Sequence, residues 1–156
     1  MRGGLRWEIR QSWRSRRRDR HGGRHVHASG GRCGRRTALN QLIAESATAL
    51  SRGYYSAPQI AALVQFVFGV DTQLIRDGSY FVLERAGMAV ACGGWSARAT
   101  LYGGDQDKPD ADPRLDPACD AARIRAFFVH PTAARQGLGR RLLSHCERQA
   151  SAAGFR

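Results

Sequence analysis

Long apolar runs are missing from this 156-residue sequence. No stretch approaches the roughly eighteen apolar residues that a membrane-spanning helix needs. The N-terminus is charged and has no apolar segment ahead of a cleavage site, which a secretory signal requires. We therefore expect a cytoplasmic protein that does not enter a membrane.

Closely spaced cysteines are also missing. None of the four forms a Cys-x-x-Cys pair, which argues against zinc ribbons and disulfide scaffolds and favours free thiols in a reducing compartment. They are Cys33, Cys92, Cys119 and Cys146. The cluster of His21, His25 and His27 near Cys33 lacks a predicted helix or strand to hold it at fixed geometry, so we expect no metal site.

Lysine is nearly absent, since Lys108 is the only one and arginine supplies the remaining basic charge. Residues 1–36 carry twelve arginines against two acidic residues, a net charge of +10, and the rest of the chain adds only +2. Residues 1–36 also have few apolar side chains and no periodicity, so we expect a basic disordered tail. Residues 37–156 are long enough for one domain with its own core.

The basic tail has several interpretations. The simplest is a translation artefact of a GC-rich coding sequence. An arginine-rich arm can also bind phosphate backbones without sequence specificity, although we do not expect nucleic acid to be the main partner. An arginine-rich leader poor in acidic residues is further typical of an organellar transit peptide.

Hydrophobic periodicity divides residues 37–156 into helices and strands. Apolar residues at helical spacing predict three helices, over 38–52, from Pro58 to Phe68 and over 72–76. Aromatic and β-branched residues predict three strands, over 79–84, 88–99 and 123–129. A last helix begins near Gly137 and ends at Gly154. This order predicts an α/β (α+β) fold, a mixed central sheet flanked by helices.

The most informative segment is the turn between the strand at 123–129 and the last helix. It reads Arg135-Gln136-Gly137-Leu138-Gly139-Arg140. A helix start presents unpaired backbone N–H groups and a partial positive charge. Glycine lets an anion approach the backbone closely, and the arginines add formal charge. These features predict an anion site, with phosphate as the natural ligand.

Two common phosphate motifs do not match. A nucleoside-triphosphatase loop needs Gly-Lys-Ser/Thr after its glycines, whereas Arg140-Arg141 follow here. A dinucleotide-binding fold needs a third glycine at position 142, which is leucine. Neither class of nucleotide-binding protein is favoured.

A different family fits the same residues. The segment Phe128-Val129-His130-Pro131, followed after four residues by Gln136-Gly137-Leu138-Gly139-Arg140-Arg141-Leu142-Leu143, closely resembles the signature of the Gcn5-related N-acetyltransferase (GNAT) family. The order of helices and strands before it is similar to this family too. The resemblance covers roughly residues 38–156 and implies an enzyme that transfers an acetyl group from acetyl-CoA to a primary amine.

The resemblance also implies binding roles for particular residues. The backbone of Phe127, Phe128 and Val129 would pair with the pantetheine arm of acetyl-CoA. The backbone N–H groups of the loop would wrap the pyrophosphate, and they belong to Gln136, Gly137, Leu138, Gly139 and Arg140. The first loop position, often Gln or Arg in the family, is Ala134 here, and Arg135 beside it is the expected substitute.

The sequence identifies no catalytic base or acid. The resemblance implies that His130 shapes the turn after its strand, while helical spacing predicts that Cys146 is core and His145 solvated. Arg123 and Arg125 on the signature strand cannot accept a proton. On the acceptor side, Tyr54, Tyr55 and Trp95 are candidates, with ordinary packing as the alternative.

Members of the family usually continue with a further strand, helix and hairpin after the position of Phe155. We therefore expect a fold that is incomplete at the C-terminus, a partial acetyltransferase domain over 37–156. Two alternatives remain open: an acyl-CoA-binding fragment without catalytic activity, and a nucleic-acid-binding protein that acts through its tail. The acceptor, a small-molecule or peptide amine, and the oligomeric state stay unassigned.

Overall fold

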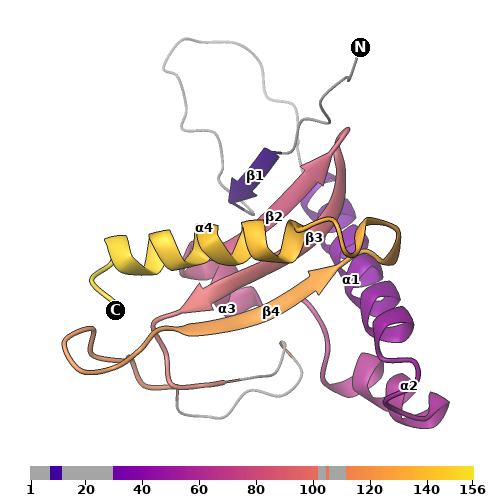
Figure 1. The fold of residues 1–156 in the computed structure, drawn as a ribbon, viewed down its shortest axis with the longest axis horizontal. Coiled ribbons are helices and arrows are strands. Elements are labelled where there is room, and N and C mark those ends of the chain that lie inside the picture. Colours follow the sequence, from indigo (N-terminus) through magenta and orange to yellow (C-terminus); the bar gives the residue numbers. More distant parts are fainter. Residues whose placement is uncertain (1–7, 12–29, 102–104, 106–111) are drawn as a thin grey trace.

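The computed structural model describes residues 8–11, 30–101, 105 and 112–156, with only the backbone for 30–33. The chain forms four strands, four α-helices and one short 3-10 helix within these ranges (Figure 1). The strands are β1 (Glu8–Gln11), β2 (Tyr80–Arg85), β3 (Met88–Ser96) and β4 (Arg123–Val129). The helices are α1 (Gly30–Leu50), α2 (Ala57–Phe66), α3 (Thr72–Arg76), η1 (Pro131–Ala133) and α4 (Leu138–Ala152).

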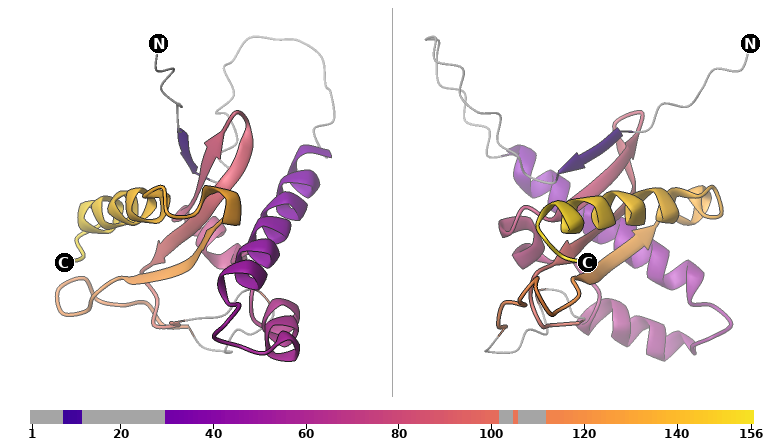
Figure 2. Two further views of the ribbon diagram at one scale, coloured as in Figure 1. Left: turned by 45° about the vertical axis from the view of Figure 1, so that its right-hand side comes forward. Right: turned by 60° about the vertical axis from the view of Figure 1, so that its left-hand side comes forward.

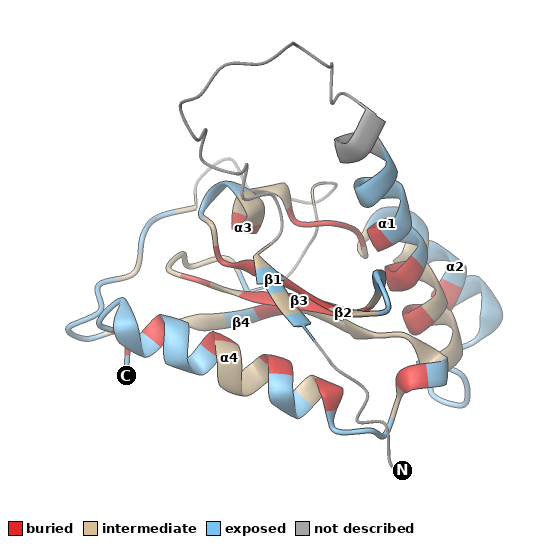
Figure 3. Cartoon of the chain, turned by 90° about the horizontal axis from the view of Figure 1, so that it is seen from above, coloured by how far each residue is buried: buried red, intermediate tan, exposed pale blue. Residues whose placement is uncertain are grey.

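The described strands form one antiparallel sheet in the order β1-β2-β3-β4. Helix α4 crosses one face of this sheet, while α1 and α3 cover the other (Figures 1 and 2). Seen along the plane of the sheet, the molecule has three layers (Figure 3). This arrangement confirms the α/β (α+β) class expected from the sequence.

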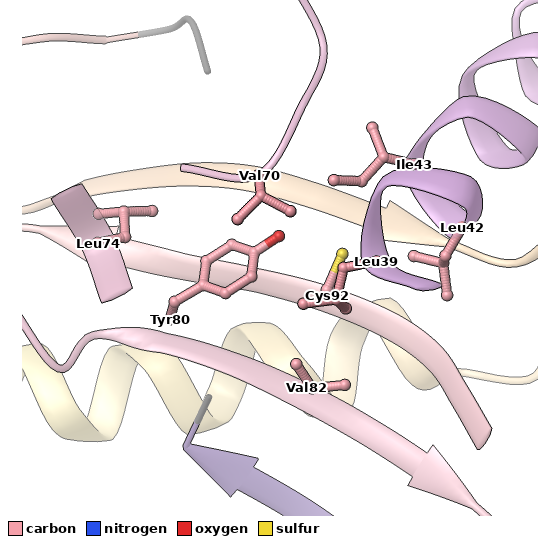
Figure 4. Close-up of a cluster of buried hydrophobic side chains, with 8 residues drawn as sticks. All are labelled: Leu39, Leu42, Ile43, Val70, Leu74, Tyr80, Val82 and Cys92. Carbon is pink, nitrogen blue, oxygen red and sulfur yellow. The ribbon is translucent and has the colours of Figure 1, made fainter. Parts of the chain in front are cut away.

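Both faces of the sheet are apolar, because alternate residues of a strand point to opposite sides. The α1-face core consists of Leu39, Leu42, Ile43, Val70, Leu74, Tyr80, Val82 and Cys92 (Figure 4). The α4-face core consists of Phe81, Leu83, Val90, Ala91, Ala133, Leu138, Leu142 and Cys146. Strand β2 divides its side chains between the two cores, so it is buried on both faces like a central strand.

The β2–β3 hairpin closes through a two-residue turn. Ala86 and Gly87 have φ angles of 51° and 79°, the left-handed pair that a type I′ turn requires. Such a turn matches the twist of the strands and sets the register in which Arg85 pairs with Met88. The turn expected at 85–87 is confirmed.

A bulge interrupts the pairing of β3 with β4. Gly94 pairs with Arg125 and Cys92 with Phe128, so Gly93 alone faces two residues of β4. One of these, Ala126, has a φ of 55°. A side chain at Gly93 would clash with the ring of Phe127, only 2.4 Å from an ideal Cβ. The bend expected at this glycine pair is therefore present, and it directs Phe127 towards α4.

The expectation of disorder in residues 1–36 is wrong for two segments. Strand β1 pairs with β2, where Ile9 lies opposite Leu83 and contacts the α4-face core. Helix α1 begins at Gly30 rather than near residue 38. A four-residue strand is stabilised by its pairing with β2, which composition alone cannot reveal. The remaining residues of the expected tail, 1–7 and 12–29, lie outside the described residues.

None of the helices in the described ranges combines the length and apolar character that crossing a membrane requires.

Candidate functional site

Strand β4 leads into α4 through a tightly held turn. Pro131 begins η1, and the side chain of His130 caps this short helix by accepting the N–H of Thr132. Ala134 then returns to extended backbone before the loop reaches Gly137, the N-cap of α4. The strand–turn–helix order predicted from the sequence is therefore present at the expected residues.

The loop itself has an unusual backbone. Arg135 and Gly137 have φ angles of 63° and 78°, in the left-handed region. Glycine adopts this conformation without strain, whereas for arginine it is uncommon. Such residues persist where the surrounding structure holds them, often at ligand-binding loops.

The start of α4 presents backbone donors. The first helical hydrogen bond is donated by Arg141 N–H to Gly137 O over 3.0 Å, so the N–H groups of Leu138, Gly139 and Arg140 precede the helical ladder. No side chain caps Gly137, and the first turn contains no acidic residue. The partial positive charge of the helix end is therefore not offset locally.

Arginine side chains surround these donors. Arg135, Arg140 and Arg141 are exposed at the loop, while Leu138 points into the α4-face core. Gly139 lies against the strand, since a Cβ there would be 3.9 Å from Val129. Because its side chain is buried, Leu138 can contribute only its backbone to a ligand, as Gly137 and Gly139 do. The combination of N–H groups and guanidinium groups without carboxylates suits a polyanion.

The end of β4 carries the other predicted binding residues. Phe127 packs on the α4 side, whereas Phe128 packs on the α1 side against Phe68, with ring centroids 5.5 Å apart. His130 N–H donates inward to Val90 O, and Val129 N–H donates to Ser46 Oγ on α1 over 3.2 Å. The backbone of Val129 thus faces away from β3, towards α1.

A buried ion pair joins β4 to α3, and the sequence did not reveal it. Arg125 lies 2.8 Å from Asp71, with side-chain exposures of 2% and 0%. Asp71 also caps α3 by accepting the N–H groups of Gln73 and Leu74. An aspartate just before a short helix is a recognisable cap, but its pairing with an arginine 54 positions away requires the tertiary structure. The pair fixes β4 beside its bulge.

The cysteine and histidine expectations have mixed outcomes. Cys146 is buried as expected, and burial raises the pKa of its thiol to about 12. Burial likewise raises the pKa of Cys92 to about 12, so neither thiol is an available nucleophile at neutral pH. The expectation of a solvated His145 is wrong: its ring lies 4.5 Å from Phe81, edge to face, and burial together with Arg148 lowers its pKa.

The three residues predicted for the acceptor side do not form one site. Tyr54 and Tyr55 are exposed in the loop between α1 and α2, and Tyr55 lines a cavity of about 310 Å³. That cavity is also lined by Thr48, Arg52, Gly53, Ala57, Ile60 and Ala61. Trp95 instead packs on the α4 face against Phe155, with ring centroids 5.8 Å apart. Trp95 is therefore separated from the tyrosines by the sheet.

The described ranges contain no group of three or more histidine, cysteine, aspartate or glutamate side chains that could hold a metal ion.

Comparison with known proteins supplies the family. The family model of the acetyltransferase (GNAT) domain matches residues 76–156, which span β2, β3, β4, η1 and α4. The chain belongs to this acetyltransferase family. It is by resemblance a GNAT-type N-acetyltransferase. No curated protein matches the chain.

Solved structures agree on the GNAT fold. One is the PaiA N-acetyltransferase of Thermoplasma acidophilum in complex with coenzyme A, at 10% identity and a TM-score of 0.59. The match covers 97% of this chain and 76% of that one. Another is a GNAT family acetyltransferase of Brucella melitensis in complex with acetyl-CoA, at 15% identity and a TM-score of 0.50, with 97% and 73% covered.

Proposed function

We propose that this GNAT domain transfers an acetyl group from acetyl-CoA to a primary amine. The observation that carries the proposal is the start of α4, where three N–H groups precede the helical ladder beside exposed arginines and no acidic residue. The solved GNAT structures with coenzyme A and acetyl-CoA support the identity of the donor. Residues 37–156, extended by β1 and the first turns of α1, would form the catalytic domain.

The proposed roles follow the local geometry. The N–H groups of residues 136–140 would hold the pyrophosphate, with Arg135 and Arg140 supplying charge, because charge-assisted hydrogen bonds to phosphate are strong. The N–H of Val129 is already donated to Ser46, so the pantetheine arm would pair with the other outward backbone groups of Phe127–Val129. In the reaction, the neutral amine attacks the thioester carbonyl, and the oxyanion collapses as the carbon–sulfur bond breaks. The nitrogen loses one proton to become an amide, and the leaving thiolate takes up one proton.

The acceptor would occupy the cavity between α1 and α2. Glu45 and Thr48 are three residues apart and so share one side of α1, while Arg52 follows the end of this helix. Glu45 contacts His130 at the end of β4, and Thr48 and Arg52 line the cavity. The end of β4 and the Thr48 wall of the cavity therefore lie along the same side of α1, about 5 Å apart along its axis at 1.5 Å per residue. Arg52 would favour amines that carry a carboxylate.

Titration of acetyl-CoA into the full chain by calorimetry tests the proposal. We expect binding by the parent and a loss of at least about a hundredfold in Gly137→Glu, which places bulk, strain and negative charge in the loop. The control is Glu147→Gln, a substitution on the exposed side of α4 that should leave binding unchanged. A folded parent that binds no acetyl-CoA would refute the proposal.

Thiol release measured on a panel of amines then separates an enzyme from a fragment that only binds. Release that requires an amine supports acetyl transfer. Tight binding without release on any amine would instead identify an acyl-CoA-binding protein without catalytic activity.

A further inference from the structure

His130, the residue directly after β4, uses both of its ring nitrogens. Nε2 lies 2.8 Å from Glu45 Oε2 on α1. Nδ1 lies 2.8 Å from Thr132 Oγ1 and 3.3 Å from the backbone nitrogen of Thr132. The ring therefore bridges α1 and η1, two segments more than eighty residues apart in the sequence.

The hydrogen-bond partners assign the tautomer of this histidine. A backbone N–H can only donate, so Nδ1 must accept from Thr132 and carries no proton. The proton then resides on Nε2 and is donated to the carboxylate of Glu45. Hydrogen bonds from Gln41 and from His130 lower the pKa of Glu45, consistent with an ionised acceptor. Both ring nitrogens are thus engaged within the protein.

The contacts continue from His130 into the loop. His130 O accepts the N–H of Ala133 over 2.9 Å, and Thr132 O accepts the side-chain amide of Gln136 over 3.2 Å. Gln136 lies between Arg135 and Gly137, the two loop residues with positive φ. A chain of hydrogen bonds therefore leads from α1 through His130 and Thr132 to the middle of the loop.

Helix α1 contacts the same end of β4 through a second residue. Ser46, next to Glu45, is buried and accepts the N–H of Val129. The position of the strand end and of the following turn is thus set by two consecutive residues of α1. The ring of His130 is 29% exposed and Glu45 42% exposed at the side chain, so solvent weakens the outer contact without removing it.

We propose that His130 is a positioning residue for the loop at 134–137, joining that loop to α1 through Glu45 on one side and through Thr132 and Gln136 on the other. The left-handed backbone at Arg135 is uncommon for arginine and needs such support. The consequence for acetyl-CoA affinity rests on the proposed function, whereas the effect on the loop does not.

Hydrogen exchange of the full chain without ligand tests the positioning directly. In His130→Asn, the amide oxygen takes the place of Nδ1 and keeps the cap on Thr132 but loses Glu45. In His130→Gln, the amide nitrogen takes the place of Nε2 and keeps Glu45 but loses the cap. We expect amides of residues 132–140 to exchange about tenfold faster in His130→Gln and about threefold faster in His130→Asn.

Glu45→Gln and Glu147→Gln provide a matched pair. Both remove one carboxylate charge, but only Glu45 contacts His130, so only Glu45→Gln should accelerate exchange in the loop. Equal exchange at residues 132–140 in the parent and in both His130 variants would overturn the proposal. Acceleration spread evenly over β2 and β3 would also overturn it, because it would indicate general destabilisation.

Acetyl-CoA binding supplies the functional readout. We expect the dissociation constant and KM for acetyl-CoA to rise about tenfold in His130→Gln while kcat stays within about twofold, since the reacting atoms are untouched. A fall in kcat at unchanged KM would contradict a positioning role and indicate a catalytic one. A parent that binds no acetyl-CoA would refute the proposed function, and the exchange measurement would still decide the role of His130.

Discussion

The two faces of the sheet are held by different kinds of contact. On the α4 side, the helix covers the strands through the apolar α4-face core, together with the ring of His145 against Phe81. On the α1 side, apolar packing is joined by directional polar contacts to β4 and to the residue after it: Asp71 with Arg125, Ser46 with Val129, and Glu45 with His130. Apolar packing tolerates small shifts, whereas hydrogen bonds and ion pairs require particular geometry. The contacts on the α1 face therefore determine where β4 lies, the strand proposed to bind the cofactor.

The largest effect is expected from breaking the buried ion pair on the α1 face. Asp71→Ala leaves Arg125 charged and buried, and it removes the cap of α3. Such a loss costs about 3–5 kcal/mol of unfolding free energy. Urea denaturation followed by circular dichroism measures it. Asp77→Ala removes a neighbouring carboxylate paired with Arg98 at 2.8 Å, but both side chains are about one-fifth exposed, so the cost should be clearly smaller. Equal losses would show that burial of the pair is unimportant.

A somewhat smaller effect is expected on the α4 face. The side chain of Leu142, on α4, is fully buried in the α4-face core. Leu142→Ala should lower the free energy of unfolding by about 3 kcal/mol through lost burial and a cavity. Thermal unfolding should then shift down by about 6–12 °C for a chain of this size. Leu143, the next residue, is only partly buried and makes the matched control. A comparable shift in Leu143→Ala would contradict the assigned orientation of α4.

The acceptor cavity on the α1 side gives an intermediate effect that depends on the proposed function. Arg52→Ala should raise KM about tenfold for amines that carry a carboxylate and leave neutral amines unchanged, because one charge-assisted hydrogen bond is lost. Steady-state kinetics on paired acidic and neutral amines measures this difference. Arg76→Ala, an exposed arginine on α3, is the control. A uniform rise for all amines would argue against recognition of the carboxylate by Arg52.

The smallest effect is a pH dependence on the α4 face. Burial and Arg148 depress the pKa of His145 in the folded protein below its ordinary value of about 6.5. The unfolded chain therefore binds the proton more readily, so the stabilising contribution is complete above the ordinary pKa and is lost as pH falls through the lower folded value. Unfolding midpoints between about pH 8 and 5 should fall less steeply in His145→Gln. An unchanged slope would exclude His145 as the cause.

The loop and the helix after β4 could be predicted because their determinants are adjacent in the chain. Gly137 at the N-cap, the apolar spacing of Leu138, Leu142 and Cys146, and Gly154 at the end each act within a few residues. The same holds for α3, for the Ala86–Gly87 turn and for the bend at Gly93. Local backbone preference and periodicity are properties of short segments, so they can be read without a fold.

Other features depend on partners that are distant in the sequence. Strand β1 was missed because four residues in a basic segment form a strand only when β2 is available to pair with them. The partial burial of His145 was not predicted, because no residue near it in the sequence indicates its contact with Phe81. Trp95 was grouped with Tyr54 and Tyr55, although the sheet separates them.

By itself, the sequence determined the order of the elements, the strand–loop–helix unit of the candidate phosphate site and its resemblance to the GNAT family. Only the tertiary structure decided that Asp71, Ser46 and Glu45 all act on β4 and the turn that follows it. The physical reason is that backbone geometry and amphipathic period are encoded over a few residues. A buried charge or a side-chain hydrogen bond, in contrast, acquires its partner only when the fold brings distant segments within hydrogen-bonding distance.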